Sequence, residues 1–282
     1  MRKPTRITLL VLVSLIGLSC HFPTPTPVIT EPPPSLGFSP LLYRGPGGDA
    51  SSLLLGGVQD EDWVSAAVTA AIFRGGEAYD FYSQAGLAGT GTGGSPSLEL
   101  VCSSYFVSTD LASADNGLLG VFSGWPVLRR PQQDLPLDDM MSLRAVADWL
   151  ADHGMSSPMV RITRVLHVDV DGDGFDEALI SAALFADPTG HMTQAGDYSV
   201  VLMRKAVGEE VMTIPLVGEY YDSAEPVLTF PFTYSLEHAL DLNGDGILEV
   251  VVGVRGWEES GAQVYEIDDL DVTQVLAAQC GL

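Results

Sequence analysis

Basic residues are scarce in this sequence: 13 lysines and arginines stand against 37 aspartates and glutamates, a formal net charge of −24. A nucleic-acid-binding surface needs clustered lysine and arginine, so this deficit argues against nucleic acid as a partner. The sequence also lacks an apolar run of the roughly 18–20 residues that a transmembrane helix needs. With 46% hydrophobic residues in 282, the chain still has ample material for a folded core.

The first 19 residues are typical of an export signal. Arg2, Lys3 and Arg6 precede a short apolar stretch, Ile7–Ser19. The stretch ends at Cys20 and resembles a bacterial lipoprotein signal, in which the cysteine becomes the lipidated N-terminus. The resemblance implies a signal peptide over residues 1–19, lipidation of Cys20, and an extracytoplasmic protein anchored in the bacterial cell envelope. The alternative is an ordinary secretory signal and a secreted protein.

Residues 20–40 are rich in proline and threonine. Proline cannot continue a helix or donate to a sheet, so we expect this segment to be an extended tether. Removing residues 1–19 takes away three basic residues and no acid, so the formal charge falls from −24 to −27. Such a domain should be repelled by anionic lipid and should contact the membrane only through its lipid.

Residues 41–157 are expected to form an α+β portion with two helices. The first helix is expected at 63–73, after acidic residues, and the second at 139–152 with Asp138 as its cap. The expected strands are 78–82, 98–107 and 118–122. The glycines of 89–94 have the spacing of a dinucleotide-binding loop, but Pro96 follows where its helix would begin, so we interpret them as a flexible loop.

The C-terminal part, residues 158–282, contains an internal repeat. Residues 169–177 read DVDGDGFDE and residues 241–249 read DLNGDGILE, so equivalent positions are 72 residues apart. A strand-like segment precedes each copy, and an apolar run and two further strand-like segments follow it. We therefore expect two four-stranded antiparallel units, over about 158–220 and 230–282.

The repeated motif is typical of a loop that holds a cation by oxygen ligands. Side chains at loop positions 1, 3, 5 and 9 and the carbonyl at position 7 can converge when glycines at positions 4 and 6 permit the tight turn. Six or seven hard oxygens favour Ca²⁺ over Mg²⁺. The expected ligands of two Ca²⁺ sites are Asp169, Asp171, Asp173, Phe175 and Glu177, and Asp241, Asn243, Asp245, Ile247 and Glu249. The alternative is a pair of metal-free turns.

These loops resemble the calcium loops of FG-GAP/VCBS-type repeats of the integrin-like propeller family, in which such a loop joins two strands of one blade. The resemblance covers about residues 161–276 and implies calcium ligation by the same residues, although two units cannot close a propeller. The expected fold is mainly β, of the α+β class: two blade-like units preceded by an α+β portion. The first loop has four carboxylates against three in the second, so we expect it to depend more on the ion.

The sequence has only three cysteines. With Cys20 lipidated, Cys102 and Cys280 remain as an even pair in an oxidising compartment. We predict a disulfide between them that ties the C-terminal residues to the N-terminal half. The alternative is two separately buried thiols.

The function expected from these features is non-catalytic. A tethered, acidic domain with calcium-stiffened loops would offer a surface for binding a protein or a glycan, or for structural work. The five histidines lack zinc-ligand spacing, and His238 shares its strand alternation with Leu236 and Leu240, so we expect it in the core. The alternative function is a secreted hydrolase with its site between residues 41–157 and the β repeats.

Overall fold

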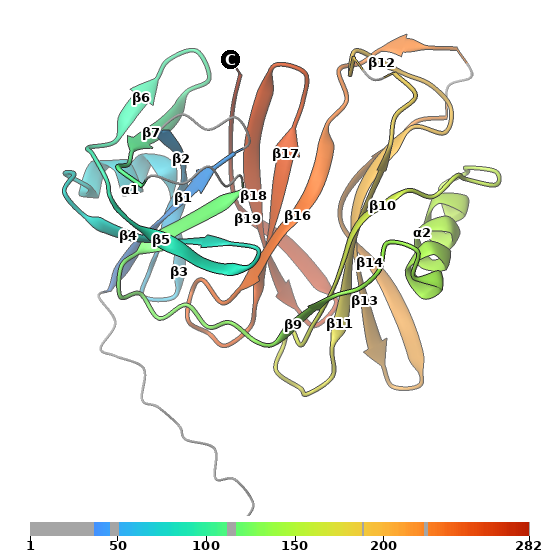
Figure 1. The fold of residues 1–282 in the computed structure, drawn as a ribbon, viewed down its shortest axis with the longest axis horizontal. Helices are drawn as coiled ribbons and strands as arrows, with labels where there is room; N and C mark the ends of the chain where they lie inside the picture. Colours follow the sequence, from blue (N-terminus) through green and yellow to red (C-terminus); the bar gives the residue numbers. More distant parts are fainter. Residues whose placement is uncertain (1–36, 46–50, 112–116, 188, 223–224, 282) are drawn as a thin grey trace, which may run out of the picture. The chain divides into compact units, whose positions relative to one another are not determined.

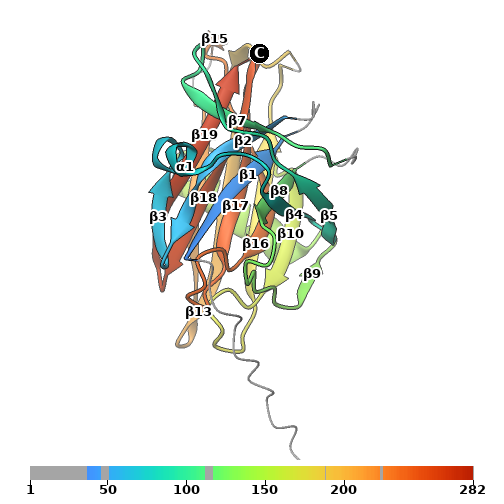
Figure 2. The same ribbon diagram turned by 90° about the vertical axis from the view of Figure 1, so that its left-hand side faces the viewer.

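Antiparallel sheets make up most of the protein (Figures 1 and 2), which confirms the expected mainly β architecture. The structure, a computed structural model, describes residues 37–45, 51–111, 117–187, 189–222 and 225–281. The expected signal peptide, Cys20 and most of the expected tether lie outside these residues. The described residues belong to one compact unit, and neither of their helices has the length and apolar character that crossing a membrane requires.

The N-terminal sheet has eight strands in the order β5-β4-β8-β1-β2-β7-β6, with β3 paired to β2. The strand expected at 98–107 is divided into β6 and β7 by a turn at residues 100–103. The strands are β1 (Phe38–Arg44), β2 (Ser51–Gln59), β3 (Asp62–Ser65), β4 (Ala78–Ser83), β5 (Gly86–Thr92), β6 (Ser97–Glu99), β7 (Ser104–Ser108) and β8 (Leu118–Phe122).

The last residues of the expected tether belong to this sheet. β1 begins at Phe38 and pairs with β2 along its length, so Pro40 lies within a strand. Pairing of β1 with β8 starts only at Leu41. Pro40 therefore lies where β1 has a partner on one side only, a position at which a missing N–H is tolerated.

The first helix is shorter than expected. α1 covers Ala66–Ile72, whereas Trp63 and Val64 belong to β3 and pair with Val58 and Gly57 of β2. The indole of Trp63 also donates a hydrogen bond to Glu266, at 3.2 Å. The hairpin with β2 and the contact with Glu266, 203 residues away in sequence, hold Trp63 and Val64 in a strand, whereas the local pattern predicted helix for the whole segment.

The glycine-rich segment is a strand rather than a flexible loop. In β5, Gly89 pairs with Phe81 and Gly91 with Tyr79 of β4. A Cβ atom at Gly91 would lie 3.0 Å from the Cβ of Leu111, so the close packing there favours glycine. The expectation of a loop failed because glycine has little intrinsic preference for strands.

Each repeat forms an antiparallel sheet: the second has the expected four strands, whereas the first has five, because a short strand from before the repeat, residues 132–134, pairs with its edge. The first sheet has the order β14-β13-β11-β10-β9 and the second the order β16-β17-β18-β19. The strands of these sheets are β9 (Gln132–Asp134), β10 (Ile162–Val168), β11 (Glu177–Leu184), β13 (Tyr198–Val207), β14 (Glu210–Tyr220), β16 (Thr233–Leu240), β17 (Glu249–Arg255), β18 (Glu259–Asp268) and β19 (Asp271–Gly281). A small two-stranded sheet consists of β12 (Met192–Thr193) and β15 (Val227–Leu228).

The sheet of the second repeat lies between the other two sheets, as Figure 1 shows. Along β17, Val250, Val252 and Val254 pack with the first repeat, whereas Val251 packs with the N-terminal sheet. Successive side chains of a strand point to opposite faces, so a strand buried on both faces is apolar throughout. This explains the run of valines in β17.

The second helix, α2 (Met140–Asp152), covers the outer face of the first repeat sheet. Its Val146 and Leu150 are buried with Ile180 and Val200. The cap is Asp139 rather than the expected Asp138, because the Asp139 Oδ2 atom accepts a hydrogen bond from the Ser142 N–H at 2.7 Å. The helix thus packs on the first repeat sheet, although the sequence analysis assigned it to the N-terminal portion.

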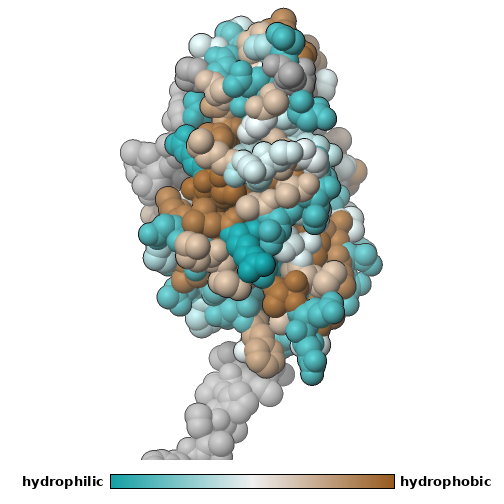
Figure 3. Space-filling view, turned by 90° about the vertical axis from the view of Figure 1, so that its right-hand side faces the viewer, coloured by the Kyte–Doolittle hydropathy of each residue, from teal (hydrophilic) through white to brown (hydrophobic). Residues whose placement is uncertain are grey.

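Not all apolar side chains around α2 are buried. Figure 3 shows hydrophobic areas beside hydrophilic ones on the side of the molecule that carries the helix. The exposed apolar residues in and near α2 and β14 include Met140, Met141, Met159, Val211 and Met212. α2 therefore buries one stripe and leaves the methionines at its start in solvent.

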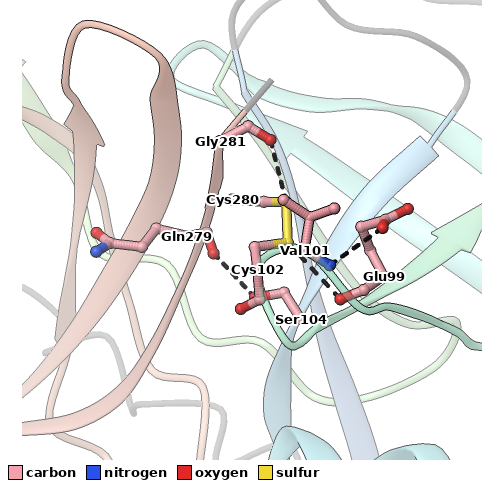
Figure 4. The surroundings of a disulfide bond; sticks show 7 residues. All are labelled: Glu99, Val101, Cys102, Ser104, Gln279, Cys280 and Gly281. Atoms are coloured by element: carbon pink, nitrogen blue, oxygen red, sulfur yellow. Dashed lines mark hydrogen bonds between the residues drawn. A yellow bond between two sulfur atoms is a disulfide. The ribbon is translucent and has the colours of Figure 1, made fainter.

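Cys102 and Cys280, the pair expected from the sequence, form a disulfide with a Cα–Cα distance of 5.1 Å (Figure 4). The bond links the turn between β6 and β7 to the end of β19. The Ser104 hydroxyl donates a hydrogen bond to the Gln279 carbonyl beside it, at 2.9 Å. The final strand is thus attached to the N-terminal sheet by a covalent bond and a hydrogen bond.

Candidate metal centre

The two repeated loops lie at equivalent places in their sheets. The first joins β10 to β11 and the second joins β16 to β17, and each pair of strands is antiparallel. Glu177 and Glu249, at loop position 9, are the first residues of the strands that follow. Two rigid strands therefore hold both ends of each loop.

The first acid of each loop organises the turn. Asp169 accepts hydrogen bonds from the N–H groups of Gly172 and Gly174, at 2.7 and 3.2 Å. Asp241 accepts from Gly244 and Gly246 in the same way, at 2.6 and 3.1 Å. All four glycines have φ between 81° and 91°, a conformation that side chains disfavour. The loops thus share one backbone conformation.

The later positions also match between the loops. One oxygen of Asp171, and the equivalent oxygen of Asn243, accepts from the N–H two residues later, at 3.2 and 3.0 Å. The Oε2 atoms of Glu177 and Glu249 accept from the N–H at loop position 2, at 2.8 and 2.6 Å. The other carboxylate oxygen of each glutamate, Oε1, takes no part in this hydrogen bond.

In the first loop, three of the expected ligands converge. Asp169, Asp171 and Glu177 each offer an oxygen, and these atoms lie within 4.8 Å of one another. Two ligands of one Ca²⁺ ion are at most about 5 Å apart, since each Ca–O distance is about 2.3–2.6 Å. The group does not include Asp173, whose Oδ1 accepts from the Phe175 N–H at 2.8 Å. The exposed Phe175 side chain has no ligating atom, so only the backbone carbonyl of this residue could be a ligand.

The second loop is more deeply buried. Asp241, Asn243 and Glu249 are 3%, 4% and 0% exposed. Among the described residues of the second loop, no three carboxylates have oxygens within 4.8 Å of one another. The reason is that Asn243, an amide, stands at the loop position that Asp171 occupies in the first loop. Asn243 donates to Asp245 at 3.0 Å, while the Asp245 Oδ1 accepts from the Ile247 N–H at 2.7 Å.

In the second loop, Glu249 has an oxygen that a cation would suit. Its Oε1 atom is buried and has no hydrogen-bond partner among the described residues. Burial raises the pKa of Glu249 to about 9, and the charges of Asp241 and Asp245 act in the same direction against the hydrogen bond from Leu242. Burial likewise raises the pKa of Glu177 and of Asp241. A buried polar atom without a partner is costly, and a cation held by oxygen ligands would supply one.

Lys205 is a residue of the first loop's surroundings that the sequence analysis missed. Its Nζ lies 2.8 Å from Asp171 Oδ2 and 3.2 Å from Asp269 Oδ1. Burial alone would raise the pKa of Asp171, but the hydrogen bond from Lys205 brings it below its ordinary value. Lys3 and Lys205 are the only lysines of the sequence, a rarity that could have drawn attention to Lys205.

Arg130 joins the two loops, and it was also missed. Its guanidinium donates to the carbonyls of Asp169 and Val170, at 2.7 and 2.6 Å, and to the carbonyl of Gly246. The Leu248 N–H also donates to the Val170 carbonyl at 2.9 Å. The loops, 72 residues apart in sequence, are thus neighbours in the structure.

Comparison with known proteins gives no match: no family model, curated protein or solved structure is similar to this chain.

Proposed function

We propose that each repeated loop binds one Ca²⁺ ion, as the FG-GAP/VCBS-type loops that they resemble do, and that each repeat sheet is a blade-like unit. The observation that carries this proposal is the buried, unpartnered Oε1 of Glu249. Glu249, Asp241, Asn243, Asp245 and the Ile247 carbonyl would hold one ion. Asp169, Asp171, Asp173, Glu177 and the Phe175 carbonyl would hold the other.

From the surroundings of the two loops we propose the opposite order of ion dependence to the one expected from their numbers of carboxylates. Lys205 already places a positive charge against Asp171 in the first loop. Described lysine, arginine and histidine residues form no such ion pair with the carboxylates of the second loop. The second loop would therefore depend more on its ion.

The whole protein would be a non-catalytic, extracytoplasmic lipoprotein that uses its calcium-stabilised domain for binding or as a structural surface. Every side-chain oxygen assigned to the loops takes part in ligation or in the turn, which favours a structural role for the metal. The partner would be a protein or a glycan. The membrane would be contacted only through the lipid on Cys20.

Calorimetry of metal-stripped protein tests the calcium sites. With affinities of about 0.1–1 mM, as in extracellular modules, about 1 mM Ca²⁺ would stabilise the fold by about 0.4–1.4 kcal/mol per site. Glu249→Gln should keep the melting temperature of the metal-free protein, because a neutral amide suits the buried position, and should remove the stabilisation from the second site. No Ca²⁺ binding up to several millimolar would contradict the proposal.

Fractionation of bacteria tests the anchor separately. The wild-type protein should partition with membranes, and Cys20→Ala should release it. A membrane-bound Cys20→Ala protein, or wild-type protein free in the medium, would show that Cys20 is not an anchor.

A further inference from the structure

A hollow of about 560 Å³ lies between the two repeats, at the end opposite the metal loops. The loops follow the last residues of β10 and β16, whereas the hollow is lined by residues at the starts of these strands, among them Thr163 and Thr233. Arg161, just before β10, and Arg255, at the end of β17, line it as well. Its volume is in the range of small-ligand sites.

The two arginines are unusual in so acidic a protein. Two of its 13 basic residues face one hollow, and both are exposed. No carboxylate pairs with the guanidinium of Arg161 or Arg255 among the described residues. The one acid in the lining, Asp187, uses both its oxygens as acceptors for Thr189, His191 and Met192. The hollow therefore offers free, planar donors of the kind that recognise oxyanions in a bidentate way.

An aromatic side chain completes the lining. Trp257 is 50% exposed and is held by the His191 ring, edge to face at 4.4 Å, and by the Phe230 ring at 5.5 Å. Phe230 has φ 51°, a left-handed conformation that is unfavourable for an aromatic residue before a proline. Such strain persists where the surroundings enforce it, often at functional sites.

Equivalent positions of the two repeats line the hollow with different chemistry. With the 72-residue offset, Arg161 corresponds to Thr233, and Phe185 to Trp257. Arg255 corresponds to Ala183 in the same way. The hollow is thus built jointly by both repeats, and each of them supplies one arginine.

From this combination we infer that the hollow binds an acidic saccharide. The carboxylate of a uronic or sialic acid would pair with Arg161 and Arg255, and a sugar ring would stack on Trp257. Hydroxyls of the sugar would reach Thr163 and Thr233. A longer polyanion such as nucleic acid would be repelled by the net charge of −24, whereas a short ligand with few charges would not. This inference rests on the binding function proposed above and gives it a ligand class.

Titration calorimetry of the whole protein in Ca²⁺ tests the site, with short oligosaccharides of galacturonate, glucuronate and mannuronate and with sialyllactose. At least one should bind with a dissociation constant of about 1 mM or tighter, and its methyl ester, which keeps the shape but not the charge, should bind about tenfold more weakly. Arg161→Gln, Arg255→Gln and Trp257→Ala should each weaken binding by a similar factor. Arg144→Gln is the matched control, since Arg144 is an exposed arginine that pairs with Asp148 and does not line the hollow.

Two results would overturn the inference: no binding by any of these saccharides, or binding that the three variants leave unchanged. Melting curves with and without Ca²⁺ keep this failure apart from failure of the calcium proposal. If Ca²⁺ stabilises the protein and no saccharide binds, only the saccharide site is wrong. If a saccharide binds in the predicted way and Ca²⁺ has no effect, only the calcium proposal is wrong.

Discussion

At the scale of single residues, the two loops differ in how their acidic charges are balanced. In the first loop the Lys205 side chain is 8% exposed, and its ammonium lies between Asp171 and Asp269. In the second loop the fully buried Glu249 has one oxygen without a partner. The same backbone turn thus lies beside a buried lysine in the first repeat, whereas in the second repeat it holds a buried glutamate that pairs with no basic side chain among the described residues.

Replacing Lys205 by methionine tests this balance. Lys205→Met keeps the apolar stem but leaves Asp171 unpaired, so the metal-free protein should lose about 1–3 kcal/mol of stability. Because the ammonium no longer competes, Ca²⁺ should bind the first loop more tightly by about 1 kcal/mol. Denaturation and calcium titration measure both effects. Arg144→Met, which removes an exposed ion pair, should change neither by more than about 0.5 kcal/mol, and an unaltered calcium affinity in Lys205→Met would refute the competition.

His238 is a core residue, as its strand alternation predicts, and it makes the protein sensitive to acid. It is 4% exposed, and its Nε2 lies 2.7 Å from the Gly117 carbonyl. Burial lowers its pKa from 6.5 to about 4; the Gly117 hydrogen bond opposes this shift, and Arg164 and Arg129 add to it. Between these two values the unfolded chain binds a proton that the folded protein does not. Stability is therefore retained above pH 6.5 and falls as the pH drops towards 4.

Urea unfolding at several pH values measures this contribution. The wild-type protein should lose roughly 3 kcal/mol more than His238→Gln between pH 7 and pH 4, because glutamine can donate to Gly117 but does not titrate. Comparing the two proteins cancels the titration of the many carboxylates. Parallel curves for the two would show that His238 is not responsible.

At the scale of elements, two adjacent aspartates at the start of α2, Asp138 and Asp139, have different roles. Asp139 caps the helix, and its pKa is lowered by hydrogen bonds from Ser142. Asp139→Ala should cost about 1 kcal/mol near neutral pH, whereas Asp138→Ala should cost almost nothing. Thermal denaturation of the two variants decides between the residues. The difference should disappear as the pH falls below the ordinary value of 3.8 towards the lowered pKa, because the capping charge is then lost.

Elements set by local patterns could be predicted from the sequence, and those set by distant partners could not. The strands of both repeats follow from apolar runs and strand-like segments on either side of a glycine-containing loop motif, and the shared loops follow from the motif itself. β1 contains a proline and β5 is rich in glycine, so their strand conformation depends on pairing with β2 and β4. Lys205 and Arg130 reach the loops from other parts of the chain, so no motif at the loops could indicate them.

At the scale of the whole molecule, the disulfide closes most of the chain into one covalent loop. Cys102 and Cys280 are 178 residues apart. Replacing both by serine should lower the free energy of unfolding by about 2–5 kcal/mol, because the unfolded chain gains freedom. Denaturation of the oxidised, reduced and Cys102→Ser/Cys280→Ser proteins measures the difference. The reduced and double-serine forms should agree; two titratable thiols per chain from this pair in the unreduced wild type would contradict the bond.

The position of the second repeat sheet between the other two has a consequence for biosynthesis. Its strands, residues 233–281, are made after those of the other two sheets, yet they cover the apolar faces of both the N-terminal sheet and the first repeat sheet. The apolar faces of these two sheets therefore stay exposed to solvent until the strands of the middle sheet have been synthesised. During that interval the nascent chain would be exposed to aggregation and would need chaperone protection. A chain truncated before residue 233 would therefore expose two apolar sheet faces and would be expected to aggregate rather than to fold as a smaller domain.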